Sequence, residues 1–262
     1  MTVSKTKPKT ETANETRPET GDTEVFAMTH MLHYSAKAKD ASFAVTELFF
    51  DPDEGVLRYV ALDIGGWFDR REVIVSEGLM RVPDNANRTW PAEISPEAIK
   101  EAREWTDPKV IQRMSMPATP HIMIGPFGGH FAGASPLEDP EAGDVAETEG
   151  NLRVDGFERL NDWVGLPVIG QDGEVGTSID FLFEADTRRL SHLVIDTGGL
   201  LAARQVVVPY DLLRGLGEKG QTADVNVTQA LLQDAPPLEH FDEINRSWID
   251  ALRNYYQLAP RF

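Results

Sequence analysis

Residues 57–66 read LRYVALDIGG, and residues 190–199 follow the same plan as LSHLVIDTGG. In both copies an apolar run of the kind that forms a β-strand ends at an aspartate and a Gly-Gly turn. A second apolar run follows each turn, at 71–75 (REVIV) and 204–208 (RQVVV), so the offset between copies is a constant 133 residues (57 to 190, 71 to 204). Solenoid repeats are far shorter. The stretch therefore predicts a duplicated domain rather than a repeat array.

The first copy has the pattern of a β-hairpin ahead of this stretch. Residues 43–50 are strand-like, and the turn at 51–55 offers Pro52 for its fixed φ and Gly55 for positive φ. The return strand, 56–63, carries apolar side chains on both faces, which is typical of a small closed barrel rather than of an open sheet with one wet face.

The second copy continues as PYDLL at 209–213, after LNDWVG at 160–165 and GEVG at 173–176. With the strand, Asp-x-Gly-Gly turn and strand described above, this chain resembles the PRC-barrel family. That family takes its name from the cytoplasmic domain of the photosynthetic reaction centre H subunit and includes the C-terminal domain of the ribosome maturation factor. The first copy departs from the pattern: it lacks the Gly-x-x-Gly turn and has Ser76 where the second has Pro209. The resemblance implies small antiparallel barrels that bind or assemble without known catalysis.

The predicted fold is mainly β, with two small antiparallel PRC-type barrels in tandem, each followed by a short helix. The first barrel is assigned to residues 28–105 and the second to 156–240. Breaker-rich and acidic residues make 106–155 a linker, although Ile122, Met123 and Ile124 suggest that part of it packs on a domain. A tail at 1–27, whose Thr, Glu, Lys and Pro residues offer little to bury, is predicted to be disordered, and 241–262 to contain a helix.

The helices announce themselves through their caps. Ser95 before Pro96 is an N-cap followed by proline at the first helical position, and Thr228 stands at the corresponding place in the second copy. In the C-terminal segment Trp248 and Leu252 are among apolar residues at helical spacing.

Composition limits the function. The formal net charge of −18 argues against binding to nucleic acid and to anionic membranes, since both require basic residues. The chain of 262 residues has no cysteine and no apolar run long enough to insert in a membrane, so a cytoplasmic protein is expected. His30 and His33 have a metal-compatible spacing but no third ligand nearby, so no metal or cofactor is predicted.

Asp63 and Asp196 allow two interpretations. Val-Ile-Asp-Thr-Gly around Asp196 is the signature of aspartic proteases, in which two lobes each supply one carboxylate, so a hydrolase with paired Asp63 and Asp196 is one hypothesis. The other, which we prefer, is structural: each aspartate faces an arginine across the neck of its hairpin, Asp63 with Arg71 and Asp196 with Arg204.

The turn tips are unusually apolar, with Trp67-Phe68 in the first copy and Leu200-Leu201 in the second. Apolar residues at turn tips are interface candidates. The sequence thus predicts a non-enzymatic binding or assembly protein with a protein partner, and the same surfaces suit a homodimer. A small-ligand or metal-sensing regulator is the alternative from another class.

Overall fold

The computed structural model describes residues 24–65, 72–104, 122–124, 157–198, 204–217, 220–241 and 244–257. Residues 1–23 of the predicted tail and most of the predicted linker lie outside these ranges. The elements up to residue 124 are β1 (Val25–Ala27), α1 (Met28–Met31), β2 (Ser35–Lys37), β3 (Ser42–Asp51), β4 (Val56–Asp63), β5 (Glu72–Ser76), the 3-10 helix η1 (Glu77–Leu79), β6 (Thr89–Pro91), α2 (Pro96–Glu101), β7 (Arg103–Glu104) and β8 (Ile122–Ile124).

The remaining elements belong to the second half of the chain. They are β9 (Glu158–Arg159), α4 (Leu160–Trp163), β10 (Pro167–Gly170), β11 (Gly173–Glu184), β12 (Arg189–Asp196), β13 (Gln205–Pro209), η2 (Tyr210–Leu212), β14 (Leu213–Leu216), β15 (Ala223–Val225), α5 (Gln229–Gln233) and α6 (Arg246–Tyr255). The fold is mainly β, as predicted, with short helices.

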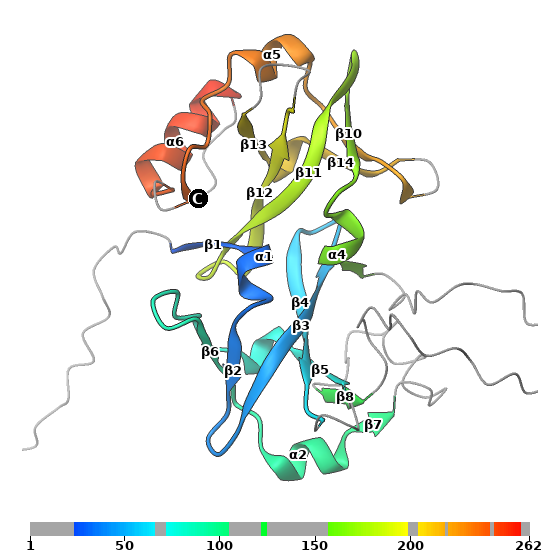
Figure 1. The fold of residues 1–262 in the computed structure, drawn as a ribbon, viewed down its shortest axis with the longest axis vertical. Helices are drawn as coiled ribbons and strands as arrows, with labels where there is room; N and C mark the ends of the chain where they lie inside the picture. Colours follow the sequence, from blue (N-terminus) through cyan, green and yellow to red (C-terminus); the bar gives the residue numbers. More distant parts are fainter. Residues whose placement is uncertain are drawn as a thin grey trace, which may run out of the picture.

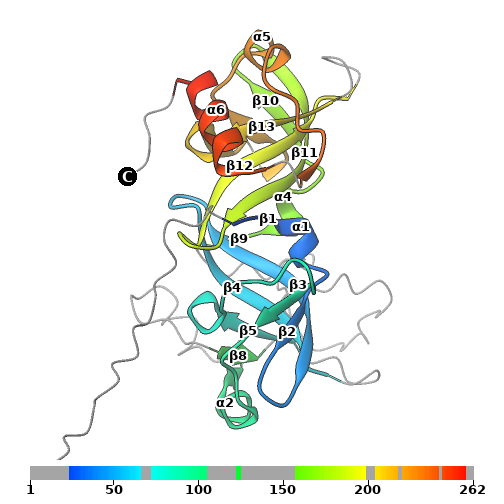
Figure 2. The ribbon, with the colours of Figure 1, turned by 90° about the vertical axis from the view of Figure 1, so that its left-hand side faces the viewer.

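One curled sheet runs through the whole molecule in the order β14-β15-β10-β11-β12-β4-β3-β2-β6. The half with β10 to β15 lies above the half with β2 to β6 in Figure 1, and Figure 2 shows the same division from the side. The two halves join where β12 and β4 pair antiparallel, with Arg189 opposite Val56. These two residues occupy the same position in the two repeats.

Both halves repeat one strand plan. In the first, β3 pairs antiparallel with β2 and β4, β4 pairs with β5, and β6 adds in parallel to β2. In the second, β11 pairs antiparallel with β10 and β12, β12 pairs with β13, and β15 adds in parallel to β10. A 3-10 helix follows the last strand of each hairpin pair, η1 after β5 and η2 after β13. The sequence offset of 133 residues is therefore repeated in the topology.

Local signals explain most boundaries. Gly55 closes the turn between β3 and β4 at a φ of 63°, and Arg188 holds the equivalent place between β11 and β12 at a φ of 58°. The side chain of Ser95 accepts a hydrogen bond from the backbone N–H of Ala98 at the start of α2, as its N-cap role predicts. Thr228 caps α5 in the same manner, through the N–H of Leu231.

The C-terminal helix is also where its spacing places it. The predicted segment 241–262 contains α6, which the side chain of Asn245 caps through the N–H of Trp248. Leu252 is buried, and the Tyr256 hydroxyl donates a hydrogen bond to the Val207 carbonyl oxygen of β13 at 3.1 Å. This helix therefore packs against the second half of the sheet (Figure 1).

Two expectations about the flanking segments are tested. The tail predicted for 1–27 ends too late, because Val25–Ala27 form β1 and pair antiparallel with β11. The side chain of Phe26 is 2% exposed, so this segment buries the apolar surface that an unfolded tail lacks. The expectation that Ile122, Met123 and Ile124 pack on a domain is confirmed, since they form β8 beside β5.

The core is continuous across the two halves. Phe50 of β3 lies 5.4 Å from Phe181 of β11, ring centre to ring centre, and Trp163 of α4 contacts both at 5.9 and 5.5 Å. Tyr210 of η2 joins the group at 6.1 Å from Phe181. Since this cluster takes side chains from both halves, the halves share one core at their junction.

Candidate functional site

The junction between the halves is held by reciprocal backbone hydrogen bonds. The N–H of Leu57 donates to the carbonyl oxygen of Arg188 at 3.2 Å, and the N–H of Leu190 donates to that of Gly55 at 2.7 Å. Leu57 and Leu190 are counterparts in the repeat, and so are Gly55 and Arg188. An approximate twofold axis therefore passes between the two hairpin turns.

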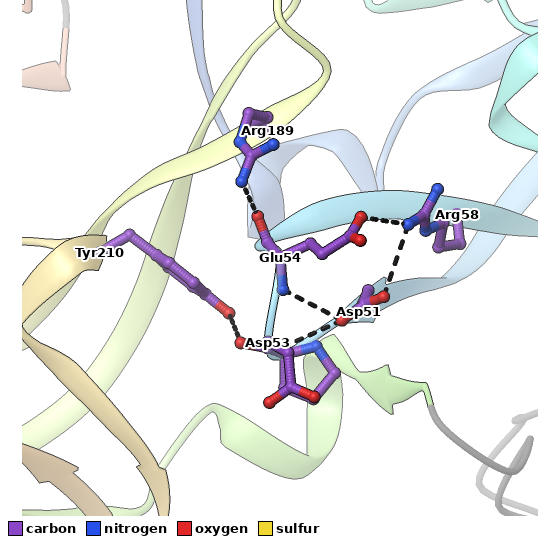
Figure 3. Close-up of polar contacts among 7 residues, drawn as sticks. Asp51, Asp53, Glu54, Arg58, Arg189 and Tyr210 are labelled. Atoms are coloured by element: carbon purple, nitrogen blue, oxygen red, sulfur yellow. Dashed lines mark hydrogen bonds and ion pairs between the residues drawn. The ribbon is translucent and has the colours of Figure 1, made fainter. Parts of the chain in front are cut away.

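On one side of this axis Tyr210 packs on Gly55. Its hydroxyl donates a hydrogen bond to the carbonyl oxygen of Pro52 at 2.8 Å (Figure 3). A Cβ at position 55 would lie 2.7 Å from the Cε1 atom of the tyrosine ring, closer than real side chains approach. Burial raises the pKa of Tyr210, so the hydroxyl stays protonated and donates.

On the other side the equivalent residues form an ion pair. Glu77, the counterpart of Tyr210, accepts a hydrogen bond from the Arg188 guanidinium at 2.9 Å. The Glu77 side chain is only 10% exposed. Burial raises the pKa of this carboxyl, and the charge of Arg188 opposes that rise.

The turn at 51–55 is stiffened by its own polar contacts. Asp51 accepts hydrogen bonds from the N–H groups of Asp53 and Glu54 at 3.0 and 3.1 Å, and its carboxylate lies 3.5 Å from the Arg58 guanidinium (Figure 3). Arg58 also pairs with Glu54, and the Arg189 guanidinium donates to the backbone carbonyl of Glu54. This turn is thereby presented to Tyr210 in one fixed shape.

The halves also exchange their leading segments. β1 and α1 precede the first half in sequence, yet β1 pairs with β11 of the second half, and α1 packs on the same strand. β9 and α4 precede the second half, yet β9 pairs with β3 of the first half, where α4 packs. Each half therefore completes the other (Figures 1 and 2).

A buried carboxylate receives each exchanged helix. Glu47 of β3 accepts hydrogen bonds from the backbone N–H and the side-chain amide of Asn161 in α4, at 3.3 and 2.9 Å. Asp180 of β11, its counterpart in the repeat, accepts from the backbone N–H of Thr29 in α1 at 3.0 Å and from the Thr29 hydroxyl. The same joint is thus built twice with different side chains.

Both carboxyl groups have altered acidity. Burial raises the pKa of Glu47 to about 7, opposed by the N–H of Leu48, by Arg159 and by Asn161. The Arg159 Nε lies 3.8 Å from the Glu47 carboxylate, and its other end pairs with Asp162 at 3.2 Å. Burial also raises the pKa of Asp180. These two acids are the best-defined buried polar groups of the junction, and all the contacts named here hold structure together.

The sequence interpretation missed Glu47 and Asp180, although a signal existed. Each is an acid inside an otherwise apolar strand, and the two stand at the same repeat position, 47 and 180. A charged residue at a core position of both copies indicates a structural partner, because an unpaired buried charge is costly.

A groove lies beside this junction on the first half. It has a volume of about 690 Å³. Residues of β1, α1, the 85–88 turn and the 241–244 segment line it, among them Phe26, His30, Tyr34 and Arg88. The Tyr34 hydroxyl donates a hydrogen bond to the Asn85 side-chain oxygen at 2.6 Å across one wall.

The predicted site aspartates have turn-forming roles. The Asp63 carboxylate accepts a hydrogen bond from the N–H of Gly65 at 3.0 Å, and Asp196 does the same with Gly198 at 2.8 Å. Both therefore cap the turn that follows their strand.

The predicted ion pair of Asp196 with Arg204 is corrected by the register. The residue opposite Asp196 is Gln205, one position beyond the expected partner. The Arg204 guanidinium instead donates to backbone carbonyl oxygens at the C-terminal end of α5, those of Leu232, Gln233 and Ala235. Helix C-terminal carbonyls lack partners within the helix and attract a cation, which explains this choice.

In the first half the register is shifted in the same way, with Glu72 opposite Asp63. Arg71, the partner predicted for Asp63, lies outside the described residues. So do the four tip residues proposed as an interface, Trp67, Phe68, Leu200 and Leu201, for which the prediction stands.

The geometry contradicts the paired-carboxylate hypothesis. Asp63 ends β4 and Asp196 ends β12, whereas these antiparallel strands meet at their opposite ends, Val56 with Arg189. At about 3.3 Å per residue, the two carboxylates are separated by tens of ångströms and cannot share a proton. Within the described ranges, no cluster of three His, Cys, Asp or Glu side chains could hold a metal ion.

The comparisons with known proteins bear on the second half. Residues 155–230 match the family model of the PRC-barrel domain. No curated protein matches the sequence. Among the described residues no helix is long and apolar enough to cross a membrane.

Proposed function

Because residues 155–230 belong to the PRC-barrel family, we propose that this protein is a non-enzymatic binding or assembly protein built from two PRC-barrel-like modules in tandem. The observation that carries the proposal is the reciprocal joint between the halves. Each half receives a strand and a helix from the other, and a buried acid fixes each helix in place. The pair thus forms one platform whose outer surfaces are free for a partner.

The repeated topology supports assigning the same module type to the first half. Its strands β2 to β6 follow the pairing of β10 to β15, including the parallel addition of the last strand. The match of Ser95 and Thr228 as helix caps extends this correspondence beyond the strands.

The chemistry of the named acids favours binding over catalysis. Glu47 and Asp180 accept hydrogen bonds from backbone and side-chain donors of an incoming helix, and Asp63 and Asp196 accept from the turns that follow them. The partner we propose is a protein that contacts the tips containing Trp67, Phe68, Leu200 and Leu201. The net charge of −18 disfavours nucleic acid, and the lack of cysteine suits a cytoplasmic location.

The test compares the full chain with a Trp67→Ser/Leu200→Ser double variant. Each is used as bait in lysate of the native host, and each is sized by light scattering to detect a homodimer. A stoichiometric partner or dimer that is lost in the double variant supports the proposal. The matched control is Val82→Ser, since the Val82 side chain is 57% exposed and lies away from the tips in sequence.

Retention of the partner by the double variant would remove the tips from the interface. Failure to recover any partner or dimer with either bait would contradict an assembly role. The alternative of a small-ligand regulator is favoured by one observation, the groove of about 690 Å³ beside β1 and α1.

A further inference from the structure

We propose that the groove bounded by β1, α1, the 85–88 turn and the 241–244 segment binds a small organic anion. The anion has a carboxylate or phosphate head, which the Arg88 wall holds, and a flat apolar body, which lies on the opposite wall. This inference does not require the assembly role proposed above.

The size of the groove suits such a ligand. Its volume of about 690 Å³ falls in the range of pockets that hold small molecules, roughly 300–1,000 Å³. It opens between elements that are far apart in the chain, since β1 comes from the start of the described residues and Phe241 from near their end. Such convergence at a junction is common for binding pockets.

One wall is apolar and aromatic. Val25, Phe26 and Ala27 of β1 form part of it, and Phe241 and Ile244 form the rest. The rings of His30 and Phe241 lie 5.3 Å apart at an angle of 58°. Flat apolar groups pack favourably on aromatic side chains in such tilted or offset arrangements.

The facing wall offers hydrogen-bond donors. Because the Asn85 side-chain oxygen accepts from the Tyr34 hydroxyl at 2.6 Å, the amide NH₂ of Asn85 is directed elsewhere as a donor. The Arg88 side chain is exposed, and among the described residues it forms no ion pair. An arginine fork and an amide donor together match the oxygens of a carboxylate or phosphate.

The charge of Arg88 is directed toward the groove. Burial raises the pKa of Tyr34, and Arg88 opposes this rise, whereas Glu24 and Asp84 add to it. Both Tyr34 and Glu24 line the groove, so the guanidinium is close enough to act on its interior. In a chain with a net charge of −18, an unpaired cation at the wall of a groove singles out an anionic ligand.

The backbone at Arg88 adds a second observation. This residue has a φ of 51°, a conformation that favours glycine or asparagine. The turn is held by the N–H of Ser35, which donates to the Arg88 carbonyl at 3.0 Å. Non-glycine residues in this conformation are concentrated at functional sites, because the local cost is retained only where the side chain is useful.

The second half does not repeat the site. At the position of Arg88 it has Gln221, and the helix-offset counterparts of His33 and Tyr34 are Gly165 and Leu166. The groove chemistry therefore belongs to the first half alone, which is expected of an acquired site rather than of a feature of the repeated fold.

The experiment titrates the full chain with phenylacetate and with phenyl phosphate, observed by nuclear magnetic resonance at the ring protons of His30 and His33 and by calorimetry. Phenylacetamide and benzylamine are the neutral and cationic comparisons. We expect at least one anion to bind with a dissociation constant of 1 mM or tighter, a level of roughly −4 kcal/mol, and both comparisons to bind at least tenfold more weakly. The difference between the two anions identifies the head group.

Two variants make the result specific. Arg88→Asn suits the positive φ and removes the charge, so we expect anion affinity to fall at least tenfold with little change in melting temperature. Arg214→Gln, which removes a cation on β14 in the other half, should leave affinity unchanged. Equal binding of benzylamine, unchanged affinity in Arg88→Asn, or no binding of either anion at 10 mM (about −3 kcal/mol) would overturn the proposal.

Discussion

Two contacts hold the hairpin turns at the junction, and they solve one geometric problem with different chemistry. On one side the Tyr210 ring covers Gly55 and its hydroxyl bonds to the backbone of the same turn. On the other, Glu77 and Arg188 occupy the equivalent positions and form an ion pair. The first depends on the shape of a bare backbone, and the second on charge. A duplicated fold can thus keep its geometry while its two copies change side chains independently.

The shape-dependent contact should be the more sensitive to substitution. Gly55→Ala places a Cβ 2.7 Å from the buried Tyr210 ring at a φ of 63°. We expect the free energy of unfolding to fall by about 2–4 kcal/mol, measured by urea denaturation, since overpacking and the left-handed backbone both oppose the substitution.

A double variant separates these two costs. In a Tyr210→Ala background, Gly55→Ala should cost only the backbone term, roughly 1 kcal/mol. An equal loss in both backgrounds would mean that the tyrosine ring does not restrict position 55.

The buried acids extend the comparison to pH. The pKa of Glu47 is raised to about 7 from its ordinary 4.5, so the folded chain binds this proton more tightly than the unfolded chain. The stabilisation is fully present below about pH 4.5 and is lost as pH rises through 7. We expect this group alone to lower the free energy of unfolding by about 3 kcal/mol across that range.

The measurement is denaturation at several pH values for the natural chain and for Glu47→Gln. The difference between the two isolates Glu47, because Asp180 and Glu77, whose pKa values are also raised, titrate in both. Parallel pH profiles would show that the Glu47 carboxyl titrates alike in the folded and unfolded states.

The charge-dependent contact should be less sensitive. Arg188→Ala leaves the Glu77 carboxylate mostly buried without its partner, which we expect to cost about 1–2 kcal/mol, because Arg188 itself is 44% exposed. Replacing Glu77 by Gln in the same chain should recover part of this loss. Additive single and double variants would mean that the two residues do not interact energetically.

Much of the fold could be predicted from local patterns. The strand runs, the positive φ at Gly55 and the caps at Ser95 and Thr228 depend on residues close in sequence, so the sequence is sufficient to place them. The hairpin register was wrong by one residue, as Gln205 opposite Asp196 demonstrates. Tip residues that are not part of the ladder shift the register without changing the apolar pattern.

The exchange of segments could not be predicted in this way. β1 and β9 satisfy the same pairing rules on either half, so nothing in their own residues selects the distant strand. What selects it is the joint at Glu47 and Asp180, whose donors Asn161 and Thr29 are more than a hundred residues away. Such a joint is visible in sequence only when the two repeats are aligned and a shared acid is found inside an apolar strand.

The smallest effect should come from the hydroxyl of Tyr210. Tyr210→Phe keeps the ring over Gly55 and removes only the bond to the Pro52 carbonyl, which water can replace, so we expect a loss of about 1 kcal/mol. Tyr256→Phe is the matched control, because it removes one similar hydroxyl bond, to Val207, away from the junction. If the hydroxyl helps to fix the turn, the amide hydrogen of Leu190, which bonds to Gly55, should exchange faster in Tyr210→Phe than in Tyr256→Phe at equal global stability. Equal exchange in the two variants would assign the hold on the turn to ring packing alone, and the contrast between a shape-dependent and a charge-dependent contact would then be complete.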